Sequence, residues 1–126
     1  MKELIFRNSW HVTYVLRLGI FRYVYGNSLA ITAESYDEIE KIWLPFTTIT
    51  VNLEDEVLPG ENYAFVDTNN CPDIYAFLVE NGIGKPTGEF GFSGMCAYPL
   101  FVFDLDNLRK ICYINRYDAT DGHDKH

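Results

Sequence analysis

The sequence has 126 residues, of which 48% are hydrophobic and 22% are charged, and this composition excludes a disordered chain. The formal net charge of −8 argues against binding of nucleic acid by the whole surface, so proteins or cations are the expected partners. We predict one soluble acidic domain over residues 1–117 and a polar flexible tail over residues 118–126. Aromatic residues make up 16% of the chain, which is more than a core of this size easily hides.

The cysteines and the apolar segments indicate the cellular compartment of the protein. Cys71, Cys96 and Cys112 are an odd number, and none of them lies in a Cys-x-x-Cys spacing. No apolar segment approaches the ~20 residues that cross a bilayer, and the first ten residues carry charges where a secretion signal would be apolar. We therefore expect a cytoplasmic protein that does not insert into a membrane.

The first third of the chain predicts antiparallel strands. Apolar and polar residues alternate over residues 10–18, which is the period of a half-buried strand. Gly19 permits a bend before a second strand over residues 20–25. The turn residues Gly26-Asn27-Ser28 then precede a strand over residues 29–33, and together these elements predict a meander.

Two structures fit residues 35–44. Ser35 and Glu38 have the spacing of a capping box and apolar residues recur at helical intervals, so a short helix is one alternative and the tip of a long hairpin is the other. Pro45 is expected to end either one. The β-branched residues that follow predict a strand over residues 46–53.

The second half predicts one main helix. An acidic connection and a strand over residues 63–67 lead to a helix over residues 71–81, for which Asn70 is the expected N-cap. Gly82 fits the left-handed position after the helix, where Ile83 can complete a Schellman ending.

The glycine-rich residues 84–97 predict a packed or functional loop, because they contain four glycines among apolar side chains. A strand over residues 98–103 follows, and Asp104 can cap a short C-terminal helix. The predicted fold class is therefore α+β, with an antiparallel sheet of about five strands packed against one main helix and a short C-terminal helix.

The sequence contains no complete cofactor-binding or metal-binding motif. Gly84-Lys85 is followed by Pro86 where a phosphate-binding loop needs Ser or Thr, and residues 67–73 have Pro72 where a calcium loop needs Gly. His123 and His126 predict only adventitious metal binding, so no cofactor and no metal are expected. We interpret the polar residues of this region as turn and cap residues, namely Asp67, Asn69, Asn70 and Gly82.

Two further groups of residues have both a functional and a structural interpretation. Cys71 in a first helical turn could be an activated thiolate with His11 as its base, but the sequence favours Cys71 as the first core residue of the helix. Arg17 and Arg22 beside the aromatic residues of 21–25 could bind single-stranded nucleic acid, but the negative remainder of the chain opposes that ligand. We expect no catalytic residue and no direct nucleic-acid contact.

Charge is distributed unevenly along the chain. Residues 1–32 have a balance of +3, whereas residues 33–126 have a balance of −11. Eight acids fall within residues 34–61, at both ends of the predicted 46–53 strand, and predict one acidic edge that could imitate a phosphate backbone. The expected partner-binding residues are Glu54, Asp55, Glu56, Glu61, Phe90 and Phe92.

Four segments, in order, carry a family resemblance. Thr50-Val51-Asn52-Leu53, the stretch from Phe65 to Asn70, the stretch from Phe77 to Gly82, and Pro86-Thr87-Gly88 resemble domain-of-unknown-function family 4313. The resemblance covers about residues 25–109, and residues 35–43 are longer than the turn of the family. It implies a small cytosolic protein of gut-bacterial mobile elements with no assigned reaction. Because such elements often carry inhibitors of host defence, it also implies a function of the anti-CRISPR or antirestriction type.

These observations favour a noncatalytic acidic protein-interaction module, whose partner could be a basic nucleic-acid-binding enzyme. Two alternatives stay open from the sequence. One is a small cysteine-dependent enzyme that uses Cys71 or Cys96, and the other is a homo-oligomeric structural module in which surplus aromatic residues form a self-complementary interface.

Overall fold

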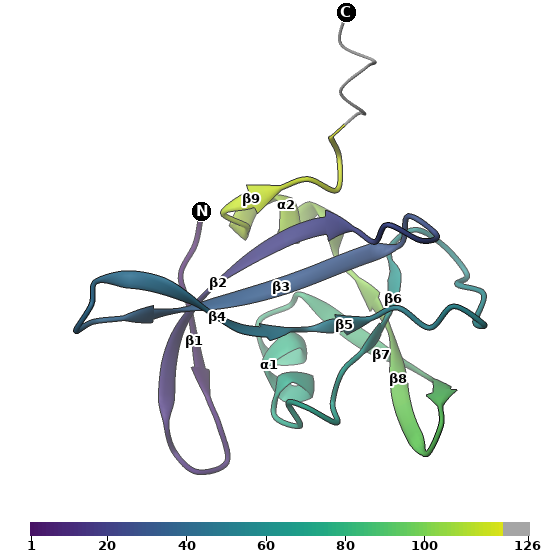
Figure 1. Ribbon diagram of the computed structural model, residues 1–126, viewed down its shortest axis with the longest axis horizontal. Coiled ribbons are helices and arrows are strands. Elements are labelled where there is room, and N and C mark those ends of the chain that lie inside the picture. Colours follow the sequence, from purple (N-terminus) through teal and green to yellow (C-terminus); the bar gives the residue numbers. More distant parts are fainter. Residues whose placement is uncertain (120–126) are drawn as a thin grey trace, which may run out of the picture.

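The computed structural model describes residues 1–119, which form nine strands and two short helices (Figure 1). In chain order the elements are β1 (Leu4–Arg7), β2 (Thr13–Arg22), β3 (Leu29–Asp37), β4 (Ile42–Thr48), β5 (Thr50–Val51), β6 (Tyr63–Val66), α1 (Ile74–Glu80), β7 (Gly84–Ser93), β8 (Cys96–Phe103), α2 (Leu105–Ile111) and β9 (Ile114–Asn115). Neither helix within these residues is long and apolar enough to cross a bilayer.

The strands form two sheets rather than the single sheet of about five strands that we expected. Sheet A has the order β1-β2-β3-β4, and β9 pairs in parallel with the part of β2 that β1 leaves uncovered. Sheet B has the order β5-β6-β8-β7. All pairings except that of β9 are antiparallel, so the α+β class is confirmed while the number and grouping of the strands were wrong.

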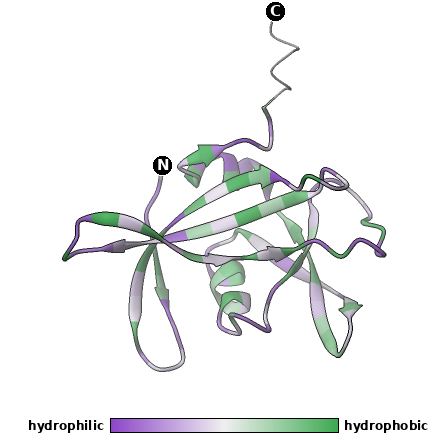
Figure 2. Cartoon of the chain, viewed as in Figure 1, coloured by the Kyte–Doolittle hydropathy of each residue, from purple (hydrophilic) through white to green (hydrophobic). Residues whose placement is uncertain are grey.

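The core lies between the inner faces of the two sheets and is closed by the helices. Figure 2 shows apolar residues recurring along β2 and β3, and side chains at alternate positions enter the core, namely Leu16, Leu18 and Ile20 from β2 and Leu29, Ile31 and Ala33 from β3. Fully buried members come from both sheets and both helices, namely Leu16, Leu18, Ile20, Ile31, Val66, Ile74, Leu78, Phe101 and Leu108. Aromatic contacts extend this core, since the Phe6 ring lies 5.3 Å from that of Phe77 and 5.4 Å from that of Phe46.

The first hairpin corrects two expectations. β2 runs without a break through Gly19, where a Cβ atom would lie 2.9 Å from both the Ile114 and Phe21 side chains, so the glycine permits close packing rather than a bend. Trp10 does not belong to the strand and is 83% exposed in the β1–β2 turn. His11, which falls within the predicted strand over residues 10–18, also lies in this turn with a φ of 64°.

Residues 35–44 form the tip of a hairpin, so the helix alternative is wrong. β3 continues to Asp37 and β4 begins at Ile42. Pro45 does not end the element but lies inside β4 opposite Glu34, where the register shifts. β4 is the edge of sheet A, and a proline is tolerated there because its missing N–H leaves no ladder bond unmade.

The expected strand over residues 46–53 divides between the two sheets. β4 ends at Thr48 in sheet A and β5 begins at Thr50 in sheet B, with Ile49 buried between them. The Thr50 hydroxyl accepts a hydrogen bond from the Ile31 N–H at 3.1 Å and lies 3.0 Å from the Tyr23 hydroxyl. Thr50 is the one buried polar residue of the described chain, and its hydrogen bonds join the two sheets.

The helix predicted as the main one is α1, which begins later than the sequence predicts and, at 7 residues, is no longer than α2. Its N-cap is Asp73 and not Asn70, because Pro72 disfavours helical geometry at the residue before it. Its C-terminal end is the expected Schellman motif, in which the Ile83 N–H donates to the Leu78 carbonyl and the Gly82 N–H donates to that of Val79. Gly82 has the positive φ of 65° that this ending requires.

The glycine-rich residues 84–97 form the β7–β8 hairpin, so the prediction of a loop was wrong. The glycines are compatible with a strand because two of them adopt positive φ at special positions, Gly88 in a bulge and Gly94 in the turn. Asp104 caps α2 as expected, since its side chain accepts a hydrogen bond from the Asn107 N–H at 3.0 Å.

Buried Thr50 leads to a prediction about stability. Replacing Thr50 with Val keeps the shape but leaves the Ile31 N–H without its acceptor, so we expect a loss of about 1–3 kcal/mol in the free energy of unfolding. Urea denaturation measures this loss. The control is Thr48→Val on the exposed edge, which should change the free energy by less than about 0.5 kcal/mol. Equal losses in the two variants would contradict the role of Thr50.

The C-terminal segment leads to a prediction about pH. Arg109 donates to both carboxylate oxygens of Asp118 at 2.8 and 3.0 Å, and this guanidinium lowers the pKa of Asp118 to about 2. The contribution of this contact to stability is therefore complete above the ordinary carboxyl pKa of 3.8 and is lost as the pH falls through about 2. Asp118→Asn should reduce the fall in melting temperature over this range. Asp106→Asn, at an 88% exposed side chain, should reproduce the wild-type curve.

Candidate functional site

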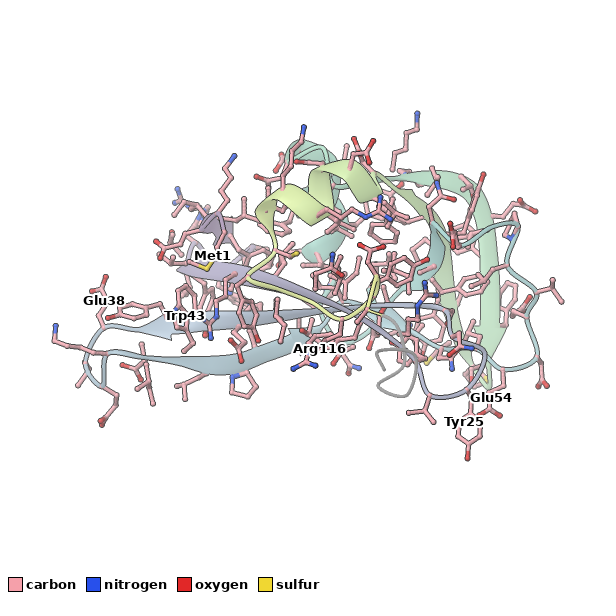
Figure 3. All side chains as sticks on the ribbon, turned by 90° about the horizontal axis from the view of Figure 1, so that it is seen from above. Met1, Tyr25, Glu38, Trp43, Glu54 and Arg116 are labelled. Atoms are coloured by element: carbon pink, nitrogen blue, oxygen red, sulfur yellow. The ribbon has the colours of Figure 1, made fainter. Side chains whose placement is uncertain are left out.

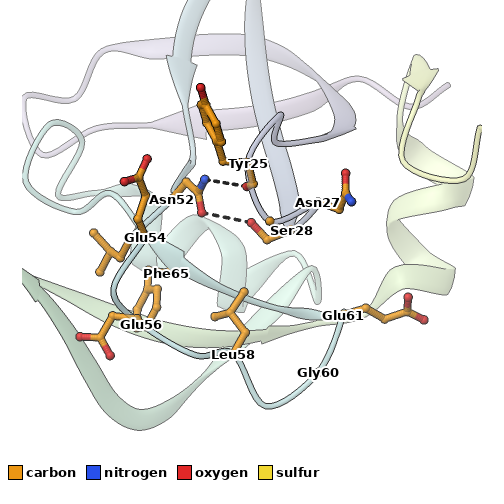
Figure 4. Close-up of a pocket in the computed structure, with 12 residues that line it drawn as sticks. Tyr25, Asn27, Ser28, Asn52, Glu54, Glu56, Leu58, Gly60, Glu61 and Phe65 are labelled. Atoms are coloured by element: carbon orange, nitrogen blue, oxygen red, sulfur yellow. Dashed lines mark hydrogen bonds between the residues drawn. The ribbon is translucent and has the colours of Figure 1, made fainter. Parts of the chain in front are cut away.

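A groove with a volume of about 810 Å³ opens between the β2–β3 turn and the connection from β5 to β6 (Figure 4). Its walls come from segments about 25 residues apart in sequence, and its floor comes from sheet B. The lining residues are Tyr25, Gly26, Asn27, Ser28, Asn52, Leu53, Glu54, Glu56, Leu58, Gly60, Glu61 and Phe65.

Hydrogen bonds hold the two walls of the groove together. The Asn52 side chain donates to the Tyr25 carbonyl at 3.0 Å and accepts from the Ser28 hydroxyl at 3.3 Å, so one amide spans both walls (Figure 4). On the far side, the Tyr117 hydroxyl donates to the Glu61 carbonyl at 2.7 Å. These contacts position the walls without using any of the carboxylates that line the groove.

The floor of the groove is apolar and closely packed. Phe65 is 5% exposed and lies beneath Leu53 and Leu58. A Cβ atom on Gly91 of β7 would lie 2.6 Å from the Phe65 ring and 2.7 Å from Leu53, so these side chains occupy the space that any other residue at position 91 would need. The floor therefore depends on a glycine in the neighbouring hairpin.

Three carboxylates lie around the rim, and no basic residue among residues 1–119 lines the groove. Figure 4 shows Glu54 and Glu56 on one side and Glu61 on the other side of the apolar floor. The structure therefore brings together three of the four acids predicted from this connection. The fourth, Asp55, is exposed in the same connection and does not line the groove.

The predicted single acidic edge is wrong. Figure 3 shows Glu54 beside Tyr25 at one end of the molecule and Glu38 at the opposite end. The acids of residues 34–61 divide because the chain passes from sheet A to sheet B at Ile49, which carries the later acids away from the β3–β4 turn. The groove is thus a separate negative site.

Phe90 and Phe92 do not join this groove. They flank Gly91 in β7, and alternate residues of a strand point to opposite faces, so the two rings lie on the other face of sheet B. They are 54% and 65% exposed. The six predicted partner-binding residues therefore occupy two surfaces of the molecule and not one.

The polar residues between β6 and α1 make local hydrogen bonds. Asp67 accepts from the backbone N–H and the side chain of Asn70 at 3.2 and 2.7 Å, and Asn69 donates to the Ala97 carbonyl at 3.3 Å. The first pair closes the turn after β6, and the Asn69 contact fastens that turn to the β7–β8 hairpin. These contacts account for the polar character of the turn in structural terms.

Cys71 lacks the environment that would activate a thiol. It lies before the helix, which begins at Ile74, and the one backbone contact that favours the thiolate comes from Ile74 and is outweighed by the effects that raise the pKa. Burial raises the pKa of the Cys71 thiol, and the nearby carboxylate of Asp73 raises it further. His11 directs its Nδ1 atom toward an Arg7 nitrogen, 3.2 Å away. Cys96 lies at the turn-proximal end of β8, opposite Ser93.

The two arginines of the predicted basic-aromatic patch are engaged within the protein. The Arg17 guanidinium lies between the rings of Trp43 and Tyr113, at 4.5 and 3.8 Å, and is 2.7 Å from the Glu34 carboxylate. Arg22 donates to the Tyr117 carbonyl at 2.6 Å. The Arg17 charge is therefore paired with a carboxylate, whereas Arg22 is held by backbone carbonyls and the Tyr117 ring, so the two guanidinium groups are both engaged within the protein.

No group of three or more potential metal ligands gathers within residues 1–119. His123 and His126, considered for adventitious metal binding, lie outside the described residues.

Sequence analysis missed the neutral residues of the groove, namely Tyr25, Asn52, Leu58 and Phe65. One signal was present, since Asn52 and Phe65 both fall in segments that carry the family resemblance. Their proximity follows only from the pairing of β5 with β6, which places Val51 opposite Phe65.

Comparison with known proteins gives one match. A family model described as a domain of unknown function, DUF4313, matches residues 17–119. No curated protein and no solved structure matches the chain.

The environment of Cys71 leads to a prediction about its reactivity. In a Cys96→Ser/Cys112→Ser background, the rate of alkylation of Cys71 by iodoacetamide should rise with a midpoint above the ordinary thiol value of about 8.5, because burial and Asp73 disfavour the thiolate. A midpoint below about 7.5 would contradict this prediction and would support a nucleophilic role.

Proposed function

Because this chain belongs to the DUF4313 family, whose description assigns no activity, we propose from the groove that it is a noncatalytic protein-interaction module that receives a basic segment of a partner. The supporting observation is the combination of three rim carboxylates and an apolar floor, with no basic lining residue in the part of the chain that the structure describes. A cationic side chain is complementary to both parts of such a groove.

Lysine and arginine side chains match this arrangement because each has an apolar stem and a charged end. The stem can pack on Leu58 and Phe65, while the charged end remains at the rim, near Glu54 and Glu56 on one side or near Glu61 on the other. Tyr25 is 72% exposed and offers a ring face to the cation, a contact worth about 0.5–1 kcal/mol at an exposed site. The net charge of −8 adds long-range attraction for a basic partner.

We infer that the partner is a basic protein that handles nucleic acid. Such enzymes present rows of lysine and arginine to phosphates, and a negative groove can occupy one of these rows. An inhibitor of host defence of the anti-CRISPR or antirestriction type would act in this way. The family membership is compatible with this proposal and assigns no partner.

The groove carboxylates provide the test. A triple variant, Glu54→Gln/Glu56→Gln/Glu61→Gln, removes three charges with little change in shape and should weaken the capture of a bacterial partner by about ten-fold or more. The measurement is a nuclease-treated pull-down, followed by calorimetric titration of the recovered protein. Nuclease treatment separates a protein partner from one bridged by nucleic acid.

The matched control removes three exposed charges elsewhere. Glu38→Gln/Glu40→Gln/Glu89→Gln changes the net charge equally at positions outside the groove, so it should retain most of the affinity. Added salt should weaken binding by wild type more steeply than binding by the groove variant. Equal losses in the two triple variants would show that overall charge acts without the groove, and would contradict the proposal.

A further inference from the structure

The β7–β8 hairpin leaves one edge of sheet B open. β7 is the last strand of this sheet, and within residues 1–119 its outer side pairs with no other strand. Its terminal stretch, residues 90–93, pairs regularly with β8 beyond the bulge that separates Pro86 from Phe90. Open edges commonly carry charges or prolines that block pairing, whereas these four residues are Phe, Gly, Phe and Ser.

The turn decides which backbone groups face this open edge. Only two residues, Gly94 and Met95, separate the paired residues Ser93 and Cys96, and such a turn closes on a pair that exchanges both backbone hydrogen bonds. Bonded and non-bonded pairs alternate, so Gly91 also bonds to β8. Phe90 and Phe92 therefore turn their N–H and C=O groups outward.

The side chains of the same stretch make the edge self-complementary. Phe90 and Phe92 are 54% and 65% exposed on one face, while Gly91 packs on the groove floor on the other face. The sequence Phe90-Gly91-Phe92 reads the same in both directions, and antiparallel pairing of two identical strands reverses one of them. A second copy therefore presents the same residues in matching order.

We propose that two copies of this chain associate through antiparallel pairing of their β7 edges, centred on Gly91. Phe90 of one copy then lies opposite Phe92 of the second copy, and the outward N–H and C=O groups of these residues form four hydrogen bonds. The facing phenylalanines form two cross-strand aromatic pairs on one face, and such pairs stabilise antiparallel sheets. The interface is isologous, so it closes as a dimer.

Charge at the interface is compatible with a second copy as the occupant. The nearest charged residue, Glu89, falls opposite Ser93 of the second copy, so the pairing brings no two carboxylates face to face. The net charge of −8 on each copy opposes approach over longer distances. Added salt should therefore strengthen the dimer, which is the reverse of its expected effect on binding in the acidic groove.

This inference goes beyond the proposed function and does not depend on it. The groove lies on the face of sheet B opposite to Phe90 and Phe92, so both grooves remain open in the dimer. The Glu54→Gln/Glu56→Gln/Glu61→Gln variant should dimerise at least as well as wild type. Conversely, Phe90→Glu should retain the affinity of the groove for its partner.

The first test measures the molar mass of the protein and the protection of its amides from hydrogen exchange at increasing protein concentration. Light scattering coupled to size exclusion should show the mass rising from one chain toward two between about 1 and 500 μM. Over the same range, NMR hydrogen exchange at the Phe90 and Phe92 amides should slow by about ten-fold. The Gly91 amide is the internal control, because it bonds to β8 in both states and its protection should change little. A mass of one chain throughout would overturn the proposal.

Two variants locate the interface. Phe92→Pro removes an outward N–H without removing a bond to β8, and Phe90→Glu places a carboxylate within the aromatic face. Each should return the mass to one chain at concentrations where wild type is dimeric. The control is Val24→Glu, which adds the same charge at a 90% exposed apolar residue in the β2–β3 turn and should remain dimeric. A Phe90→Glu variant that still has the mass of two chains would place the interface elsewhere and overturn the proposal.

Discussion

The hydrogen bonds of one buried threonine determine how the two sheets meet. Thr50 begins β5 and is 2% exposed, and its hydroxyl is within hydrogen-bonding distance of Ile31 in sheet A and of Tyr23 beyond the end of β2. The adjacent Ile49 N–H donates to the Ile31 carbonyl, and the Ile49 carbonyl accepts from Asp67 after β6. A polar group buried in this way costs free energy unless it is paired, so the position of the chain where it changes sheets is strongly specified.

The acidic groove follows directly from this crossing. Because β5 has only two residues, the chain leaves sheet B at Asn52. The Asn52 side chain forms hydrogen bonds with Tyr25 and Ser28 of the β2–β3 turn. The connection that follows then carries its carboxylates over Phe65 and not along sheet A. The same residues therefore contribute to the union of the two sheets and to the walls of the proposed binding site.

Two helix-end signals were read correctly from the sequence, whereas the cap at Asn70 and the contacts between distant segments were not. The Schellman ending at Gly82 and the cap at Asp104 depend on neighbours within about five residues, so their signals are complete in the sequence. Residues 46–53 alternate as one strand would, and nothing local marks the change of sheet at Ile49. Only the acidic residues of the groove could be predicted from the sequence. Tyr25 and Phe65 are brought near these acids by the pairing of strands, which has no local signal.

The separation of Glu38 from Glu54 has a consequence for how a partner would arrive. Electrostatic attraction in solution decays over about 8 Å at physiological ionic strength, so the two negative ends act on an approaching cation almost independently. A basic partner would therefore be attracted at each end separately. Under the proposed function it would remain at the end where an apolar floor lies beneath the carboxylates.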